Sequence, residues 1–253
     1  MLRSIKQYGG FNSYDLLKVI AILAMFIDHL GFFFYPDIEI FRVIGRMSYA
    51  LFAFAIGYSK KYNFDITILV LAILMLLNNY ISNSTNFHIA ASFKTSILFA
   101  IIITRLSMKY LHPKLNSNNI VAITFILWGM SFGTSYIFQY GTLGIIMAIC
   151  GYWARTQNNN LLYQIFLGIN LILYALFEIM VFNFSSLGCS LLLVEFLILF
   201  KLFSYFNIHT ISLNKLYQNT LLTISRYSLL LYFVHYELFY VLQLYLERQI
   251  IIL

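Results

Sequence analysis

The chain has 253 residues, of which 61% are hydrophobic, 19% are aromatic and only 10% are charged, and its mean hydropathy is +0.82. About a quarter of the residues of a soluble domain are charged, so this composition excludes a water-soluble globule and predicts a polytopic membrane protein. The net charge of +7 comes from basic residues scattered singly between apolar segments, a pattern that indicates membrane topology, and no nucleic-acid partner is expected.

The apolar segments define the expected architecture. A membrane-spanning helix needs roughly 20 apolar residues. The sequence therefore predicts one all-α integral membrane domain, residues 1–253, folded as a transmembrane helical bundle of about nine spans within a range of roughly eight to ten. The polar segment 207–226 is expected to lie on the surface. The expected spans are 14–35, 41–59, 66–82, 93–111, 119–138, 141–154, 161–183, 186–206 and 227–246.

The basic residues predict the orientation of the bundle. Cytoplasmic loops of membrane proteins carry an excess of Lys and Arg. With a cytoplasmic N-terminus, this alternation holds through all the expected spans and places the C-terminus outside. The expected cytoplasmic segments then hold Arg3, Lys6, Lys60, Lys61, Arg105, Lys109, Lys114, Arg155, Lys201, Lys215 and Arg226.

The first expected span, SYDLLKVIAILAMFIDHLG, contains three ionisable residues that a membrane accommodates only at a cost. Lys18 and His29 share one helical stripe and lie about 16 Å apart along the axis. Asp28 and His29 are consecutive, and consecutive side chains of a helix do not face each other. We therefore expect His29 to point along the Lys18 stripe into an internal cavity and Asp28 to meet a group on another helix. A core histidine that is hydrogen-bonded between helices remains the alternative.

The second expected span opens with FRVIGRMSYALFAFAIG and carries two arginines four positions apart, on one helical face. Gly45 and Ser48 permit close helix contact there. Two guanidinium groups suit a phosphate, a carboxylate or Asp28 as an internal counter-charge. Arg42 and Arg46 are expected in the outer half of the membrane, as Asp28 is. An ion pair and a ligand site both remain open.

The last expected span, SRYSLLLYFVHYELFY, places His235 near mid-membrane among aromatic residues, with Glu237 facing the other way. An imidazole with its ordinary pKa near 6.5 shuttles protons at neutral pH. Two mid-membrane histidines, His29 and His235, indicate one shared site if the bundle brings the first and last spans together.

The remaining ionisable residues have simpler interpretations. Lys94 and Glu178 lie near expected span ends, where they either extend to the interface or have a function. Glu195 is expected either to pair with a neighbouring helix or to have a function. The block QYGTLGIIMAICG carries glycines that fit tight helix packing. The sequence has no nucleotide-binding P-loop, no HExxH zinc spacing and no Gly-x-Ser-x-Gly elbow, so no metal is expected.

Four of these blocks resemble the TraX family of integral membrane proteins, whose founding member acetylates the N-terminus of conjugative pilin. The strongest are LLKVIAILAMFIDHLG and FRVIGRMSYALFAFAIGYS, followed by YGTLGII and SLLLYFVHYEL. One departure is Ala50, where the family tends to have proline. The resemblance covers nearly the whole chain and implies a multi-pass protein of the bacterial cytoplasmic (inner) membrane.

The sequence is also similar to membrane acyltransferases of acyltransferase family three. Those proteins carry a basic residue, ten intervening residues and a histidine on the first span, which is the spacing of Lys18 and His29. Their closing helix often contains a Ser-Tyr-x-x-Tyr-x-x-His pattern that Ser228, Tyr232 and His235 resemble.

The two resemblances imply transfer of an acetyl group from cytoplasmic acetyl-CoA to an amine or hydroxyl acceptor, either the pilin N-terminus or an envelope glycan. His29 is the expected general base. Asp28 is expected to stabilise charge through a partner helix, and His235 to orient the thioester carbonyl or act as a second base.

The donor and acceptor are expected to be held by basic side chains. Lys18 is assigned to the phosphates of acetyl-CoA, and Arg42 and Arg46 to donor or acceptor charge. Two alternatives from other classes are a proton-coupled transporter and a non-catalytic pilus or envelope assembly protein. The transporter would use the same buried histidines and carboxylates, whereas the assembly protein would need only the packing.

Overall fold

The computed structural model describes residues 10–62, 66–85, 97–116, 119–135, 140–157 and 160–252. The described residues form helices and no strand, and their one extended pairing is an isolated bridge between Asn12 and Thr210. The all-α fold class is therefore confirmed. The ten helices are α1 (Ser13–Phe34), α2 (Glu39–Tyr58), α3 (Ile66–Thr85), α4 (Ile97–Leu111), α5 (Ile120–Thr134), α6 (Leu143–Gln157), α7 (Leu161–Phe182), α8 (Ser186–Ser204), α9 (Lys215–Arg226) and α10 (Ser228–Ile252).

Every apolar segment predicted as a span contains a helix, and five helices are long and apolar enough to cross a membrane. These are α1, α2, α7, α8 and the Ser228–Leu246 part of α10. Apolar stretches in α3, α5 and α6 are shorter. The chain thus has the character of a membrane protein, while the number of crossings and the side of the N-terminus stay predictions.

Polar side chains define where several helices begin. Asn12 accepts a hydrogen bond from the Asp15 amide at the start of α1, and Asn160 caps α7 in the same way through the Leu162 amide. Such caps provide acceptors for N–H groups that have none within the helix. Asn214 also caps α9, which forms in the segment predicted only to be polar and superficial.

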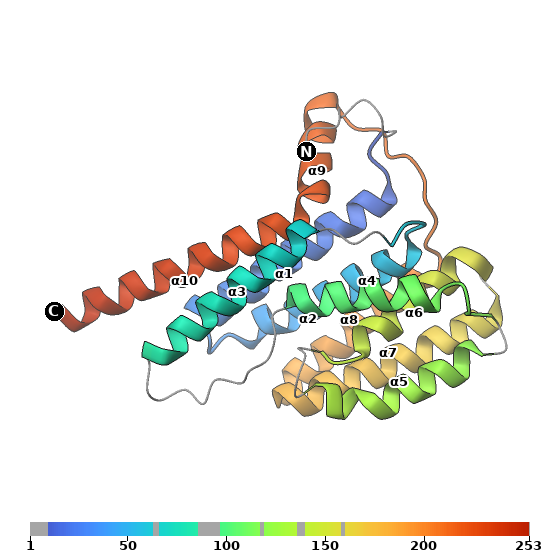
Figure 1. Ribbon diagram of the computed structural model, residues 1–253, viewed down its shortest axis with the longest axis horizontal. Coiled ribbons are helices and arrows are strands. Elements are labelled where there is room, and N and C mark those ends of the chain that lie inside the picture. Colours follow the sequence, from blue (N-terminus) through green and yellow to red (C-terminus); the bar gives the residue numbers. More distant parts are fainter. Residues whose placement is uncertain are drawn as a thin grey trace.

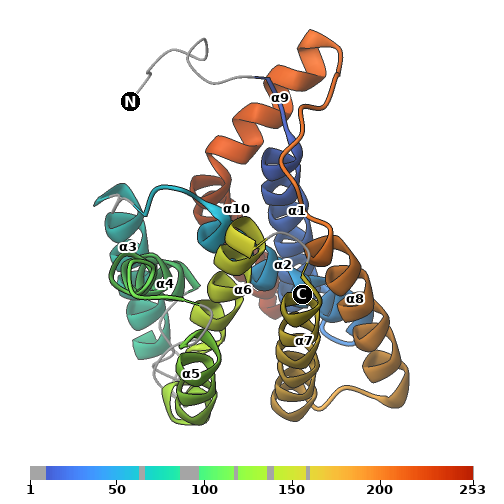
Figure 2. The same ribbon diagram turned by 90° about the vertical axis from the view of Figure 1, so that its right-hand side faces the viewer.

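Helix α2 occupies the centre of the bundle and packs against α1, α4, α6 and α8 (Figures 1 and 2). Glycines bring α2 and α6 into backbone contact. A Cβ at Gly57 would overlap the Ala148 carbonyl group, and a Cβ at Gly151 would overlap the Phe54 carbonyl group. The contact predicted for the glycine block is therefore present, and it places α2 where its residues can meet those of α1, α7 and α8.

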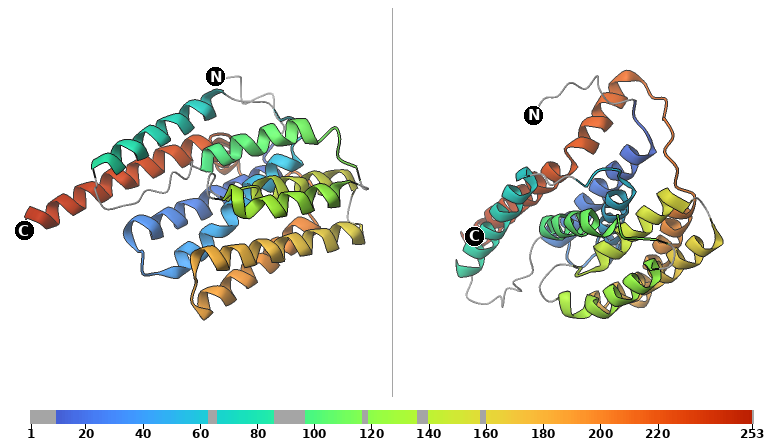
Figure 3. Two further views of the ribbon diagram at one scale, coloured as in Figure 1. Left: turned by 60° about the horizontal axis from the view of Figure 1, so that its bottom comes forward. Right: turned by 45° about the vertical axis from the view of Figure 1, so that its right-hand side comes forward.

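Helices α3 and α10 run side by side and project from the rest of the bundle (Figures 1 and 3). Asn78 of α3 donates a hydrogen bond to the Glu237 carboxylate of α10. At the other end of α10, α9 packs on α1 through Leu222, which meets Phe11 and Val19. This arrangement packs α9 and α10, which are late in the sequence, against α1, which is early in it.

Candidate functional site

The two histidines predicted at mid-membrane meet where α1 packs against α10. His29 Nδ1 lies 2.8 Å from His235 Nε2, and both side chains are buried. His235 Nδ1 in turn lies 2.7 Å from the carbonyl oxygen of Leu231, one helical turn earlier on α10. The structure therefore joins the two histidines in one hydrogen-bonded chain that ends at a backbone carbonyl.

This chain fixes the proton positions on both neutral rings. A carbonyl oxygen only accepts hydrogen bonds, so His235 Nδ1 carries the proton that is donated to Leu231. The Nε2 atom of neutral His235 is then an acceptor, and His29 Nδ1 must donate to it. The lone pair of neutral His29 is consequently on Nε2, and this atom has no hydrogen-bond partner among the described residues.

Aromatic rings surround the histidine pair. The His29 ring centroid lies 5.4 Å from that of Tyr232, 5.1 Å from that of Tyr236 and 6.3 Å from that of Phe33. Phe239 contacts the His235 ring on the other side, with centroids 5.8 Å apart. The histidine pair therefore lies in a buried and mainly aromatic environment.

Asp28 points away from His29 and bridges two arginines of α2. Its Oδ1 atom lies 2.5 Å from Arg46 Nη2 and 3.0 Å from Arg42 Nη1. Arg46 also donates from Nε to the carbonyl oxygen of Arg42 at 3.0 Å. A Cβ at position 45 would overlap the Asp28 carboxylate, so Gly45 provides the room for this contact. The structure thus forms the ion pair that the sequence left open as one alternative.

The ion cluster continues across the bundle to α7. Arg46 is 1% exposed and donates from Nη1 to the Tyr140 hydroxyl at 3.1 Å. The same Nη1 atom lies 3.7 Å from Glu178 Oε2, and the guanidinium stacks on Phe182 at 4.1 Å from its ring centroid. The cluster therefore contains two arginines and two acidic side chains, Asp28 and Glu178.

One simple interpretation of a buried acid is wrong. Glu178 does not extend to the interface, because it is completely buried and faces Arg46. Glu195 is buried on α8 and is hydrogen-bonded to the Met47 backbone of α2, which agrees with the alternative that it pairs with a neighbouring helix. Lys94 lies outside the described residues.

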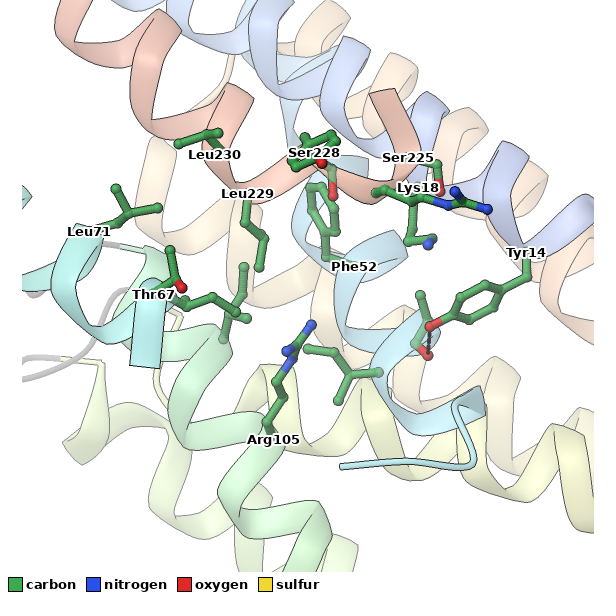
Figure 4. A pocket seen from close by; sticks show the side chains of 16 residues that line it. Tyr14, Lys18, Phe52, Thr67, Leu71, Arg105, Ser225, Ser228, Leu229 and Leu230 are labelled. Carbon is green, nitrogen blue, oxygen red and sulfur yellow. Dashed lines mark hydrogen bonds between the residues drawn. The ribbon is translucent and has the colours of Figure 1, made fainter. Parts of the chain in front are cut away.

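Lys18 lines a cavity of about 480 Å³ between α1, α2, α3, α4 and the junction of α9 with α10 (Figure 4). Its Nζ atom lies 3.3 Å from Asp15 Oδ1 and 4.7 Å from the Tyr14 ring centroid. Arg105 and Arg226 line the same cavity. Figure 4 shows the Lys18 and Arg105 side chains pointing toward the middle of the cavity from opposite walls.

The structure divides the predicted site residues into three groups. His29 meets His235, and Asp28 meets Arg42 and Arg46, whereas the Lys18 cavity contains neither His29 nor either α2 arginine among its lining residues. His29 does not line this cavity, and the expectation that it points along the Lys18 stripe into an internal cavity stays a prediction. The structure also separates Lys18 from the two arginines with which it was grouped as a donor-binding set.

Several residues of these groups were missed from the sequence. Arg105 and Arg226 were interpreted only as topology signals, and Tyr140 was not assigned a partner. Only the folding of α9 back onto α1 brings Arg226 near Lys18, so no local pattern could have revealed the pair. Among the described residues, no group of three or more histidine, cysteine or acidic side chains is placed to hold a metal ion.

Comparison with known proteins assigns the chain to a family. The family model described as "TraX protein" matches residues 13–243. The chain belongs to the TraX family. The matched residues include Lys18, the ion cluster of Asp28 with Arg42 and Arg46, and the pair of His29 with His235.

The description of a related protein does not indicate an activity. An uncharacterised protein of Rickettsia prowazekii (strain Madrid E) is 30% identical over 186 residues, which cover 69% of this chain and 71% of the relative. No solved structure matches the chain significantly. The family is therefore known, and the chemistry of the site has to be argued from its geometry.

Proposed function

We propose that this TraX-family protein is a membrane acetyltransferase that moves an acetyl group from cytoplasmic acetyl-CoA to an amine or hydroxyl acceptor. The acceptor is a protein N-terminus, such as that of a pilin, or an envelope glycan. Residence in the bacterial inner membrane with a cytoplasmic N-terminus is part of this proposal, and it rests on family membership and the distribution of basic residues.

The observation that supports this reaction most directly is the directed chain from His29 through His235 to the Leu231 carbonyl. It leaves His29 Nε2 as the atom that can accept a proton. General-base catalysis needs a neutral imidazole with one nitrogen available and a fixed ring orientation.

The chemical steps follow from this arrangement. The acceptor N–H or O–H group attacks the thioester carbonyl carbon, and its proton passes to His29 Nε2 as the new C–N or C–O bond forms. Collapse of the tetrahedral intermediate breaks the C–S bond and releases CoA as a thiolate. The thiolate takes up the proton from His29, so the histidine returns to its neutral form and one acetyl group has moved.

His235 acts as a positioning residue in this proposal. Its Nε2 atom accepts the Nδ1–H of His29, which holds the ring and stabilises the imidazolium formed during attack. The rings of Tyr232 and Tyr236 pack around the same imidazole. The earlier assignment of His235 to the thioester carbonyl is not needed, because both of its ring nitrogens are already engaged.

Asp28 and the two arginines serve the site indirectly. Their ion cluster fixes α1 against α2 at the residue next to His29. Arg46 already contacts Asp28, Tyr140 and Glu178, which leaves it poorly suited to bind donor or acceptor charge.

The test is release of free CoA thiol from acetyl-CoA by the purified protein, with amine- and hydroxyl-bearing acceptors supplied. We expect His29→Gln to lower the rate by about 10²–10⁴-fold, the range of general-base catalysis. His209→Gln is the matched control, because His209 lies exposed in the loop before α9. A folded His29→Gln protein with full activity would overturn the assignment of the base.

The two rival functions predict different results. A proton-coupled transporter moves substrate across vesicles without releasing CoA. An assembly protein supports its pathway even when Lys18 and His29 are both replaced. Either result, with no acyl transfer to any acceptor, would contradict the acetyltransferase proposal.

A further inference from the structure

The cavity around Lys18 contains a concentration of positive charge from three separate parts of the chain. Lys18 comes from α1, Arg105 from α4 and Arg226 from the end of α9. None of the lining residues within the described part of the chain is acidic. Three basic side chains from three elements therefore line one partly open cavity of about 480 Å³, where a bound anion would lie close to all of them.

Asp15 does not line this cavity, but it links α1 to α9, which form two of the cavity walls. Its Oδ1 atom lies 3.3 Å from Lys18 Nζ and accepts a 2.7 Å hydrogen bond from the Ser225 hydroxyl. Ser225 is 2% exposed and belongs to α9, next to Arg226. The contact therefore fixes α9 against α1 and orients Lys18 and Arg226 about the same space.

The start of α10 adds hydrogen-bond donors. Residues Ser228, Leu229 and Leu230 line the cavity and form the first turn of α10. The N–H groups of the first turn of a helix have no acceptor within the helix. A helix N-terminus beside lysine and arginine side chains is a favourable environment for a phosphate group.

Most of the remaining lining residues are apolar, and Thr67 is one of the exceptions. Phe52, Ile68, Leu71 and Ile101 face the same space as the three basic side chains. A site with a cationic region and an apolar wall suits a ligand that carries phosphate at one end and a less polar body beyond it.

We infer that this cavity binds the phosphate or diphosphate end of the acyl donor, with Lys18, Arg105 and Arg226 as its three cationic contacts. This inference rests on the proposed function for the identity of the donor. It extends that function by adding Arg105 and Arg226, and by removing Arg42 and Arg46 from the donor site.

The position of the cavity fits a long donor. Helix α1 carries Lys18 in the cavity and His29 about 16 Å further along its axis. Helix α10 carries Ser228 in the cavity wall and His235 about 10 Å further along. A ligand that binds by its phosphates at one end of both helices would need a body about 10–16 Å long to reach the histidine pair.

Binding of CoA itself, measured with the full-length purified protein in nanodiscs of zwitterionic lipid, tests the inference without requiring turnover. We expect Arg105→Gln and Arg226→Gln each to weaken CoA binding about tenfold, the loss expected for one hydrogen bond to a charged group. Lys201→Gln is the matched control, because Lys201 lines a different groove between α1 and α8.

Truncated ligands identify the phosphates as the recognised group. Pantetheine, which lacks phosphate, is expected to bind the wild type and both variants equally weakly. Equal loss of CoA and pantetheine affinity would show general damage to the site and overturn the inference. Arg105→Lys retains the charge and is expected to recover part of the CoA affinity, which distinguishes a lost contact from misfolding.

A lipid headgroup presents the same phosphate chemistry, and a second arm separates the two sources. Nanodiscs that contain anionic phospholipid are expected to leave CoA affinity unchanged. If anionic lipid displaces CoA, and Arg226→Gln abolishes that displacement, the cavity is a lipid site and the donor assignment fails. Unchanged CoA binding in both arginine variants would also contradict the inference that this cavity binds the acyl donor.

Failure of the inference can be told apart from failure of the proposed function. If CoA binds tightly and its binding depends on Arg105 and Arg226, but no acyl transfer occurs, the binding site is supported and the proposed reaction is contradicted. If acyl transfer occurs and the KM for acetyl-CoA is unchanged in both arginine variants, the proposed reaction is supported and the binding site is contradicted.

Discussion

Asp28 and His29 are consecutive residues of α1 that contact different helices. A rotation of about 100° per residue turns the Asp28 carboxylate to the arginines of α2 and the His29 ring to α10. One residue therefore contributes to packing and charge balance, while its neighbour has the lone pair that proton transfer requires. This division explains why two titratable groups are adjacent in an apolar span without forming a dyad.

At this scale, loss of one charge from the ion cluster has a predictable cost. Asp28→Asn removes the carboxylate that lies 3.0 Å from Arg42 and 2.5 Å from the buried Arg46. Breaking a buried ion pair from one side typically costs about 3–5 kcal/mol. We expect a clear fall in the free energy of unfolding in detergent.

The double variant Asp28→Asn/Arg46→Gln is the control for that prediction. Removing both members of the closest pair should destabilise the protein by less than the sum of the single changes. Additive losses would indicate that Asp28 and Arg46 do not interact in the folded protein.

The histidine chain gives a second prediction for single residues. His235→Phe removes the acceptor of the His29 Nδ1–H group but keeps an aromatic ring in place. Loss of an orienting partner of this kind costs roughly 10–100-fold in activity. We expect kcat for acetyl transfer to fall by that amount while KM for acetyl-CoA stays unchanged. An equal rise in KM would assign His235 to donor binding instead.

At the scale of helices, close contact between α2 and α6 places the arginines of α2 within the bundle. Gly57 and Gly151 face backbone atoms of the opposite helix, so neither position has room for a side chain. In a membrane the hydrophobic effect does not drive helices together. Small residues at helix contacts allow the close van der Waals packing that does. The close approach of α2 to α6 therefore depends on two glycines, one on each helix.

Substitution of Gly57 tests this dependence. Gly57→Ala introduces a methyl group against the Ala148 carbonyl and is expected to lower the free energy of unfolding by roughly 1–3 kcal/mol. Gly129→Ala on α5 is the matched control, because nothing lies within 4 Å of the added Cβ. Alanine is the better helix former, so that change should leave stability equal or higher. Equal effects of both changes would contradict the packing account.

Much of the fold was predictable from apolar segments, since a run of lipid-compatible residues has few conformations other than a helix in a membrane. Helix α9 was missed as a helix because its segment is polar, although Asn214 as an N-cap followed by spaced apolar residues was a usable signal. The contact of Asp28 with Arg42 and Arg46 was predictable because α1 and α2 are joined by a short loop. The cavity with Arg105 and Arg226 was not, because it needs α4 and α9 to converge on α1 from distant parts of the chain.

At the scale of the whole molecule, the orientation in the membrane decides which side each site faces. With a cytoplasmic N-terminus, the Lys18 cavity opens near the cytoplasmic ends of α1 and α4, where acetyl-CoA is available. The histidine pair lies further along α1, toward the outer half. The proposed donor and acceptor sites are then reached from opposite directions.

Cysteine labelling measures this orientation and the number of crossings together. In a background without Cys150 and Cys189, we expect Lys114→Cys to react only with reagents on the cytoplasmic side. Ser135→Cys, at the end of α5, should react only from outside if about nine spans cross. Reaction of both positions from the cytoplasmic side would show that α5 does not cross the membrane.

The most direct test of the central claim is transfer of isotopically labelled acetyl from acetyl-CoA to an acceptor by purified protein, followed by mass spectrometry. The account predicts a labelled amine or hydroxyl product, one equivalent of free CoA thiol per product, and loss of both with His29→Gln but not with His209→Gln. Labelled product formed equally by the His29→Gln protein, or no product with any acceptor while CoA binds, would contradict it.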